Sequence, residues 1–286
     1  MLKKYFSYLG VFVLVCFSFF YTEKAAEIVR MNDPIMKVIL QNSSYYEIEP
    51  VNAIITGDEI IPGLNGRTVN VNESYSNMKK INRYQESLLV FDEVLPEIIL
   101  EYDKYLVQGN DTIQQVALIF KVDSISNLKQ VSKILLDKNV VATFFIDGDV
   151  IQANLDEIEG LASDGYEIEN LGYQGVYSKE RFMWTNNMIE TLTDSKVKYC
   201  YTEYKNSSIL DLCSSHKMYT IQPTIYTGNY PFLSVKKNLE NGSMISFDLK
   251  SQTLKELPSV ISYIKQKGYD LVTVNQLIDQ SSSNDK

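Results

Sequence analysis

From Gln114 onward, short apolar runs alternate with stretches of helical periodicity, and this alternation limits the fold more than any other feature. The run "VALIF" at 116–120 is followed by residues 127–138, where apolar side chains recur at helical spacing, namely Leu128, Val131, Ile134 and Leu135. The runs "VATFFI", "YEIENL", "VKYCY", "MYTIQPTI", "SMISFDL" and "YDLVTV" continue the rhythm. Apolar strands between amphipathic helices predict an α/β fold, either an α/β barrel or a doubly wound parallel sheet. Chemistry is then expected at the carboxyl ends of the strands.

The rest of the chain divides at changes of composition. Residues 45–112 contain short β-branched and aromatic runs separated by turn residues, which predicts a small β-rich module before the α/β domain at 113–280. Residues 22–44 are predicted to form a helical stalk, in which Pro34 suits a first helical turn. The last residues, 281–286, are expected to be a disordered tail.

The first segment, residues 1–21, has the pattern of a membrane anchor. Lys3 and Lys4 precede an apolar run at 5–21, which as a helix reaches about 25 Å, against about 30 Å for the hydrocarbon core of a bilayer. Because no convincing small-x-small cleavage site follows, an uncleaved anchor is favoured over a removed signal peptide or lipidation at Cys16. The positive flank predicts a single-pass protein of the cell membrane, with a cytoplasmic N-terminus and an extracellular body.

Composition and charge exclude some classes of function. The 286 residues are 45% hydrophobic and 22% charged, which is typical of a globular protein rather than a disordered one. The net charge of -9 argues against nucleic acid as a partner, because phosphate binding needs clustered Lys and Arg. Cys200 and Cys213 can pair in an exported compartment, although two unpaired thiols fit the sequence equally well.

Five segments resemble, in order, the motifs of one enzyme family. "VALIFKVDS" resembles the family's VALTFDDGP, "NVVATFFIDGDVI" its NVKATFFVIG, "LASDGYEIENLGYQG" its GHEIGNHTYSH and "NGSMISFDL" its GSIILLHD, and the last helix and strand keep the KGY and VT pieces. The family is the polysaccharide deacetylases, also called carbohydrate esterase family 4 or NodB-homology domains. The resemblance covers residues 114–280. It implies a distorted (β/α) barrel and the metal-dependent removal of acetyl groups from peptidoglycan, chitin or xylan.

The residues that carry the family's chemistry are replaced in this chain. By the resemblance, the replaced positions are Lys121 for the general base, Val122 for one metal ligand, Leu171 and Gly175 for two His ligands, Tyr201 for the Arg of the motif that orients the base, and Asp248 for the general acid. Of that base-orienting motif, only Tyr204 is kept. Val, Leu and Gly offer no side-chain ligand, and a protonated Lys cannot act as a base. A register shift to recruit Asp123 would turn that side chain to the other face of the strand. We therefore expect no catalytic residue, no metal and no cofactor of the family type.

The leading hypothesis is a pseudoenzyme that binds cell-wall polysaccharide such as peptidoglycan, or a cell-envelope protein. Sugars stack on aromatic faces, so a groove that once held a sugar chain can still bind one. The aromatic residues expected to line such a groove are Tyr173, Tyr177, Trp184, Tyr201 and Tyr204. A further alternative assigns the function to the module at 45–112 and makes the barrel a platform.

Two chemical alternatives use the remaining acids. A metal-free hydrolase can work with paired carboxylates, for which the candidates are Asp123, Asp248 and Glu169. A hard cation can be held by oxygen ligands, for which the candidates are Asp147, Asp149, Glu167 and Glu169. The single histidine, His216, aligns with no catalytic position of the family, and a surface or helix-capping role is favoured for it.

Overall fold

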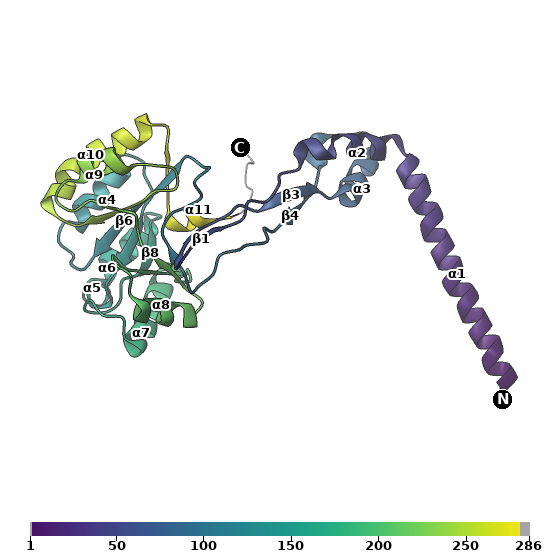
Figure 1. The fold of residues 1–286 in the computed structure, drawn as a ribbon, viewed down its shortest axis with the longest axis horizontal. Helices are drawn as coiled ribbons and strands as arrows, with labels where there is room; N and C mark the ends of the chain where they lie inside the picture. The colour runs from purple at the N-terminus through teal and green to yellow at the C-terminus, as the bar shows by residue number, and fades with distance from the viewer. Residues whose placement is uncertain (1, 281–286) are drawn as a thin grey trace. The chain divides into compact units, whose positions relative to one another are not determined.

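The chain folds into two compact units with separate cores. The structure is a computed structural model and describes residues 2–280 (Figure 1). Among the described residues, the N-terminal unit comprises residues 2–50 and Asn65–Leu95, and the half-barrel unit comprises Val51–Leu64 and residues 96–280. The alternating pattern that begins at Gln114 falls entirely within the half-barrel unit.

The half-barrel unit is built on one curled sheet. In residues 2–280 this sheet has eleven strands, ordered β1-β2-β5-β10-β9-β8-β7-β6-β12-β11, with β13 beside β6. The strands are β1 (Ile54–Thr56), β2 (Glu59–Ile61), β5 (Tyr105–Leu106), β6 (Gln115–Val122), β7 (Thr143–Ile146), β8 (Glu167–Asn170), β9 (Tyr199–Tyr201), β10 (Tyr219–Ile221), β11 (Ile225–Tyr226), β12 (Met244–Asp248) and β13 (Asp270–Val272). All pairings are parallel except the β1–β2 hairpin. The predicted α/β class is confirmed, and the sheet is an open half-barrel because β1 and β11 end the order.

Strand β6 shows why this sheet is buried on both faces. Its alternate side chains enter two different apolar clusters: Val116, Leu118, Phe120 and Val122 join the cluster beneath the helices, and Ala117 and Ile119 join the cluster on the other face. Phe120 stacks between Phe144 and Phe247, with ring centroids 5.1 and 5.3 Å away. Burial of such rings contributes much of the hydrophobic stabilisation of a core.

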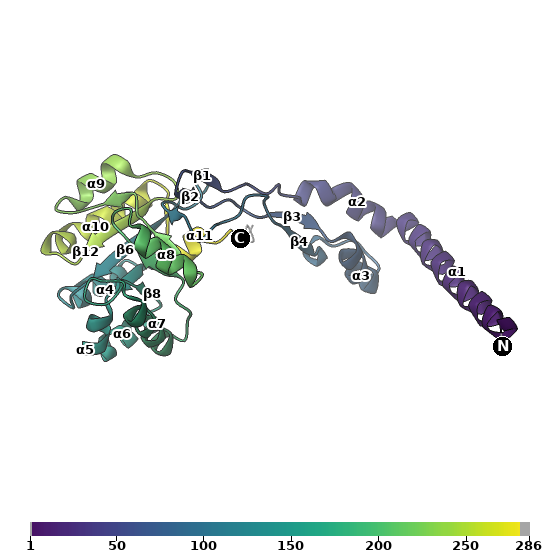
Figure 2. The same cartoon turned by 60° about the horizontal axis from the view of Figure 1, so that its bottom comes forward.

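Helices cover the outer face of the half-barrel. They are α4 (Leu128–Asp137), α5 (Gly148–Ala153), α6 (Leu155–Ser163), α7 (Lys179–Thr193), α8 (Ser207–Ser215), α9 (Pro231–Asn238) and α10 (Ser251–Gln266). Figure 2 shows α9 and α10 side by side, and their contacts confirm this placement. The last helix, α11 (Val274–Ile278), packs instead into the other apolar cluster and begins with a capping box between Thr273 and Gln276.

The N-terminal unit has a small core of its own. It contains α1 (Leu2–Asn32), α2 (Pro34–Tyr46), α3 (Val71–Ile81), the 3-10 helix η1 (Glu86–Leu88) and the antiparallel hairpin of β3 (Gly66–Val69) and β4 (Phe91–Val94). Its buried cluster contains Ile35, Ile39, Val69 and Met78. Pro34 takes the first turn of α2, as predicted, and Asp33 caps that helix. Lys79 and Tyr75 of α3 donate hydrogen bonds to the Asp33 carboxylate at 2.6 and 3.1 Å, which ties α3 to α2.

The membrane anchor expected at residues 5–21 is contradicted. These residues belong to α1, which continues across the expected boundary between anchor and stalk as far as Asn32. Among the described residues, none of the helices combines the length and the apolar character that a bilayer crossing requires. The apolar run is flanked by charged residues on both sides and is shorter than the roughly 20 residues of a typical span. The prediction of a single-pass membrane protein is therefore wrong, and the extracellular placement that rested on it is left without support. The tail expected at 281–286 lies outside the described residues.

The region expected as one β-rich module at 45–112 is shared between the two units. Residues 51–64 and the chain after Pro96 supply β1, β2 and β5 to the half-barrel sheet, where β5 pairs in parallel with both β2 and β10. Asn65–Leu95 packs instead with α2, the helix of the expected stalk. Strand pairing between distant residues sets these boundaries, and local composition does not reveal it.

Candidate functional site

The carboxyl ends of β6, β9 and β12 bring a group of charged side chains together. Lys121 on β6 lies opposite Asp248, the last residue of β12, in the parallel register. The Nζ atom of Lys121 lies 3.0 Å from Asp248 Oδ1 and also forms an ion pair with Glu203, just beyond β9. The Nζ atom of Lys250 lies 2.7 Å from the other Asp248 oxygen. We call Lys121, Glu203, Asp248 and Lys250 the mouth cluster.

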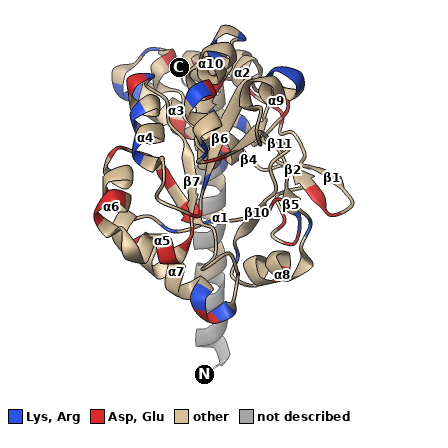
Figure 3. Cartoon of the chain, turned by 90° about the vertical axis from the view of Figure 1, so that its left-hand side faces the viewer, with Lys and Arg blue, Asp and Glu red and all other residues tan. Residues whose placement is uncertain are grey.

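Lys121 and Asp248 keep their charges at neutral pH. Partial burial works against the Lys121 ammonium, but hydrogen bonds to Glu203 and Asp248 outweigh it and raise the pKa of Lys121. Burial also works against the Asp248 carboxylate, yet hydrogen bonds from Lys250 and Lys121 lower the pKa of Asp248. Lys121 is therefore a charged ammonium group, which neither accepts a proton nor ligates a metal. Figure 3 shows Lys and Arg interspersed with Asp and Glu along the elements of the half-barrel unit.

Two members of the mouth cluster were absent from the sequence prediction. Glu203 follows β9 in "YCYTE", and Lys250 follows β12 in "FDLK". The available signal was a charged residue shortly after a predicted strand, which is common at a solvated sheet edge. The curl of the sheet, which brings β9 near β6 and β12, supplies the information that the sequence pattern lacked.

Val122 and Leu171, the positions that the resemblance assigns to metal ligands, lie in two different cores. Val122 is fully buried in the cluster beneath the helices. Leu171 is buried in the other cluster, which also contains Phe145 and Tyr201. Asp123, the residue after Val122, is exposed. The structure therefore does not bring these positions together into a polar site.

A buried carboxylate holds the loop that follows β8. Asp147 is 2% exposed, caps α5, and accepts the backbone N–H groups of Gln174 and Gly175, both at 2.7 Å. Gly175 has a φ of 72°, a left-handed conformation that favours glycine. The Asp149 carboxyl lies beside Asp147, and their hydrogen bond raises the pKa of Asp149. The segment in which the resemblance places two His ligands is thus organised by Asp147 and backbone N–H groups.

The Tyr177 hydroxyl group lies between the carboxyl ends of β8 and β9 and is hydrogen-bonded to both strands. Tyr177 Oη donates to the carbonyl oxygen of Asn170 at 2.7 Å and accepts the N–H of Tyr201 at 3.0 Å. These bonds flank Asn170–Cys200, the register pair that joins β8 and β9. Burial of the hydroxyl raises the pKa of Tyr177, which keeps it neutral and able to donate. Tyr177, expected as a groove wall, is thus a structural spacer.

The expected aromatic residues near the mouth cluster differ in exposure. Tyr201 is buried, and its Oη lies 2.7 Å from Ser246 Oγ. Tyr204 is 78% exposed. Tyr226, which the sequence did not indicate, is partly exposed and donates a hydrogen bond of 2.8 Å to the carbonyl oxygen of Glu203. Tyr204 and Tyr226 therefore offer aromatic surface beside the mouth cluster.

A second aromatic group lies on the loop after β8 and on α7. The rings of Tyr173 and Trp184 pack edge to face with centroids 5.5 Å apart. The Arg181 guanidinium lies over the Tyr173 ring at 4.6 Å, and Tyr173 Oη donates to Gln152 at 3.0 Å. Both expected aromatic residues are thus engaged with neighbours of the same unit.

The acids proposed for a metal-free hydrolase do not form one site. Glu169 Oε2 accepts the N–H groups of Lys198 and Tyr199 at the start of β9, whereas Asp248 ends β12. Strands β6 and β7 lie between β12 and β8, so at about 4.8 Å per strand the backbones of Asp248 and Glu169 are roughly 14 Å apart along the sheet. Within residues 2–280, no group of three or more His, Cys, Asp or Glu side chains can hold a metal ion. The four acids considered for a hard cation therefore do not converge either.

The cysteines and the single histidine have structural positions. Cys200 on β9 and Cys213 on α8 form a disulfide, with Cα atoms 6.5 Å apart, and both are fully buried. His216 follows α8, and its Nδ1 lies 2.9 Å from the carbonyl oxygen of Leu212. Its ring also packs edge to face on Phe182, at 5.3 Å. This placement agrees with the capping role favoured for His216.

Comparison with known proteins places these features in a family. The family model described as polysaccharide deacetylase matches residues 108–211. An uncharacterised protein of Bacillus subtilis, YlxY, is 31% identical over 278 residues, which covers 89% of this chain and 86% of YlxY.

Solved structures extend the similarity to three dimensions. The structure of wild-type BA3943 from Bacillus anthracis, described as a CE4 family pseudoenzyme, is 26% identical, with a TM-score of 0.66 over 87% of this chain and 96% of that one. A BA3943 mutant, described as a CE4 family pseudoenzyme with restored enzymatic activity, is 25% identical, with a TM-score of 0.67 over 86% of this chain and 98% of that one. The similarity to these two structures extends beyond the residues that the family model matches.

Proposed function

This chain belongs to the polysaccharide deacetylase family, and we propose that it is a pseudoenzyme of that family which binds a glycan through the mouth of its half-barrel. The ion pairs of Lys121 with Asp248 and Glu203 carry this proposal. They hold the Lys121 ammonium group at the end of β6, where the family's base and first metal ligand are expected. The similarity to a protein described as a pseudoenzyme supports the same conclusion.

The residues present do not fit the metal of the family mechanism. Metal-assisted deacetylation needs a divalent ion that polarises the acetyl carbonyl and activates water. At the positions expected to hold it, Val122 and Leu171 are buried apolar side chains, and the Gly175 N–H is bonded to Asp147. The Lys121 ammonium would repel a divalent ion at the end of β6. No step of the family mechanism can therefore be assigned to these residues.

Glycan binding is supported by the surface beside the mouth cluster. Tyr204 and Tyr226 present aromatic faces on which sugar rings can stack. The carboxylates of Glu203 and Asp248 are partly exposed, with 34% and 28% of their side-chain surface accessible. Carboxylate oxygens accept hydrogen bonds from sugar hydroxyls. Aromatic faces next to fixed polar groups are the combination that sugar-binding surfaces use.

Retention on insoluble peptidoglycan tests this proposal. The full chain should be retained, and Tyr204→Ala should bind roughly two- to tenfold more weakly because one stacking surface is lost. Tyr45→Ala, which removes an equally exposed tyrosine from the N-terminal unit, serves as the matched control and should bind like the wild type. Equal retention of Tyr204→Ala and wild type would rule out this surface. Failure of the wild type to bind would make a cell-envelope protein the next candidate, to be sought by cross-linking.

A further inference from the structure

The side chain of Glu169 lies between β8 and β9 and separates the two strands; we call the boundary between these strands the seam. Glu169 is 2% exposed, and its Oε2 accepts the N–H groups of Lys198 at 3.0 Å and Tyr199 at 2.9 Å. In a regular parallel ladder, successive N–H groups point alternately to the two neighbouring strands, and the one that faces β8 would bond to its backbone. The carboxyl group replaces that ladder, and the strands keep the single register pair Asn170–Cys200. Their amino ends therefore diverge.

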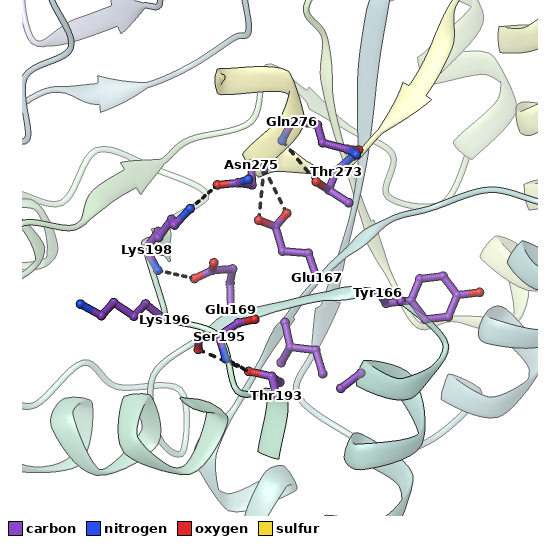
Figure 4. Close-up of a pocket in the computed structure, with 13 residues that line it drawn as sticks. Tyr166, Glu167, Glu169, Thr193, Ser195, Lys196, Lys198, Thr273, Asn275 and Gln276 are labelled. Carbon is purple, nitrogen blue, oxygen red and sulfur yellow. Dashed lines mark hydrogen bonds between the residues drawn. The ribbon is translucent and has the colours of Figure 1, made fainter. Parts of the chain in front are cut away.

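A cavity of about 490 Å³ occupies the space beside this divergence (Figure 4). Its walls come from the start of β8, the segment before β9 and the start of α11, and include Glu167, Glu169, Ser195, Lys198 and Gln276. Glu167 is the first residue of β8, so the cavity lies at the amino edge of the sheet, opposite the mouth cluster. Cavities of this size accommodate small-molecule ligands.

The two carboxyl groups in this cavity have different bonding. Glu167 accepts hydrogen bonds from Thr143 Oγ1 at 2.5 Å and from the N–H of Asn275 at 3.2 Å. Glu169 uses Oε2 for both of its backbone bonds, and within residues 2–280 its Oε1 makes no hydrogen bond. Figure 4 shows the Glu169 carboxyl group directed toward Lys198 beside the cavity. Because Glu169 Oε1 is not one of the fully buried atoms that lack a partner, this oxygen is open to the cavity, where a ligand or water can donate a hydrogen bond to it.

Two lysines, Lys196 and Lys198, also line the cavity, and Lys198 is already engaged. The Nζ atom of Lys198 lies 2.6 Å from Asn275 Oδ1, so its hydrogen bond goes to the amide and not to either carboxyl group. Burial, followed by the charge of Glu167, raises the pKa of Glu169 well above its usual value. An added positive charge would relieve this repulsion between Glu167 and Glu169.

We propose that this cavity binds a small hydroxylated primary amine, whose ammonium group pairs with Glu169 and whose hydroxyl groups contact Ser195 and Gln276. The two carboxyl groups select the ammonium, and the remaining polar walls suit hydroxyl groups. A metal ion is a poorer ligand, because no group of three or more ligating side chains is present in the described residues. This site is separate from the mouth cluster and does not depend on glycan binding there.

Titration calorimetry of the full chain with D-glucosamine tests the site, because this compact probe carries one ammonium group and several hydroxyl groups. N-Acetyl-D-glucosamine, which lacks the charge, is the matched ligand. Saturable glucosamine binding is expected, at least about tenfold tighter than that of the acetylated sugar, since a lost charged hydrogen bond changes affinity by that order. Glu169→Gln should weaken glucosamine binding by a similar factor. Glu159→Gln, an exposed acid on α6, should leave it unchanged.

Two further variants keep the test decisive. Ala162→Phe fills the cavity without altering a carboxyl group, so it should abolish binding even if Glu169→Gln does not fold, as judged by circular dichroism. Tyr204→Ala, at the opposite edge of the sheet, should retain full glucosamine binding. The proposal is overturned if the wild type shows no saturable binding, if the two sugars bind equally, or if folded Glu169→Gln or Ala162→Phe binds normally. Loss of binding in Tyr204→Ala would place the ligand elsewhere and would also overturn it.

Discussion

Lys121 is the residue on which the mouth cluster depends, because two carboxylates share its ammonium group. Lys121→Met should therefore lower the free energy of unfolding by on the order of 1 kcal/mol, since both acids lose a charged partner in a partly buried site. Urea denaturation at neutral pH measures this change. The matched control is Lys133→Met, which removes the exposed ion pair with Asp137 on α4 and should cost less. Equal losses in the two variants would show that the mouth cluster is no more than a surface ion pair.

Glu169 is expected to make the free energy of unfolding fall as the pH rises. Its pKa is raised in the folded state, so above about pH 4.5 the unfolded chain releases a proton that the folded protein still holds. The free energy of unfolding should therefore fall as pH rises from there toward the raised pKa. Glu169→Gln should reduce this slope, and Glu167, whose pKa burial also raises, should maintain part of it. Urea denaturation across this pH range, with Glu159→Gln as control, checks the prediction, and identical slopes in wild type and Glu169→Gln would contradict it.

At the scale of residues, the sequence located the strand end that carries Lys121 and Val122 but not the hydrogen bonds that support the site. The motif "VALIFKVDS" was enough to place Lys121 and Val122 at the end of a buried strand, where β6 has them. The role of Asp147 was not predicted, because its carboxylate binds the N–H groups of Gln174 and Gly175, 27 and 28 positions away. A side-chain bond to a distant backbone leaves no periodic signal in a sequence.

At the scale of elements, the seam between β8 and β9 depends on the Tyr177 hydroxyl. Tyr177→Phe would leave the Asn170 carbonyl and the Tyr201 N–H without their partner, so unfolding should become easier by about 1–3 kcal/mol. Tyr230→Phe, which removes a hydroxyl from an exposed ring, should have almost no effect. Both are measured by urea denaturation. A Tyr177→Phe variant as stable as Tyr230→Phe would mean that water takes over both hydrogen bonds of the Tyr177 hydroxyl with no loss in the free energy of unfolding.

The disulfide joins a central strand, β9, to the helix α8 that covers it. Its cysteines are separated by 13 positions, and closing a loop of this size stabilises a fold by about 3 kcal/mol in the chain-entropy description. The double variant Cys200→Ala/Cys213→Ala should lose stability of that order in urea denaturation. Reductant should lower the stability of the wild type and leave the double variant unchanged. A wild type insensitive to reductant under unfolding conditions would contradict the pairing.

Elements with continuous apolar or amphipathic patterns were well predicted, and those decided by capping or pairing were not. The predicted helix at 127–138 corresponds to α4, Leu128–Asp137. Within the region at 45–112 that was predicted to be β-rich, the run "GRTVNVN" is divided between β3, which ends at Val69, and α3, which begins at Val71. Asn70 caps α3 by accepting the N–H of Glu73, and this bond outweighs the β-branched pattern of the run.

At the scale of the whole molecule, the α/β domain was predicted and the arrangement before it was not. Pairing of β5 with β2 and β10 assigns parts of the expected module to the half-barrel sheet, and only the folded chain shows such pairing. The predicted anchor rested on an apolar run of marginal length, and α1 does not meet the requirements of a membrane span. The family resemblance, which rests on several motifs in order, was confirmed.

The pseudoenzyme proposal is tested most directly by acetate release. The full chain is incubated with acetylated chitooligosaccharide and with peptidoglycan, with Zn²⁺, Co²⁺ or Mn²⁺ added, beside an active polysaccharide deacetylase as positive control. Because Lys121, Val122, Leu171 and Gly175 supply neither base nor metal ligand, acetate should stay at the level of the protein-free blank under every condition. Metal-dependent acetate release that scales with the concentration of this protein would contradict the proposal.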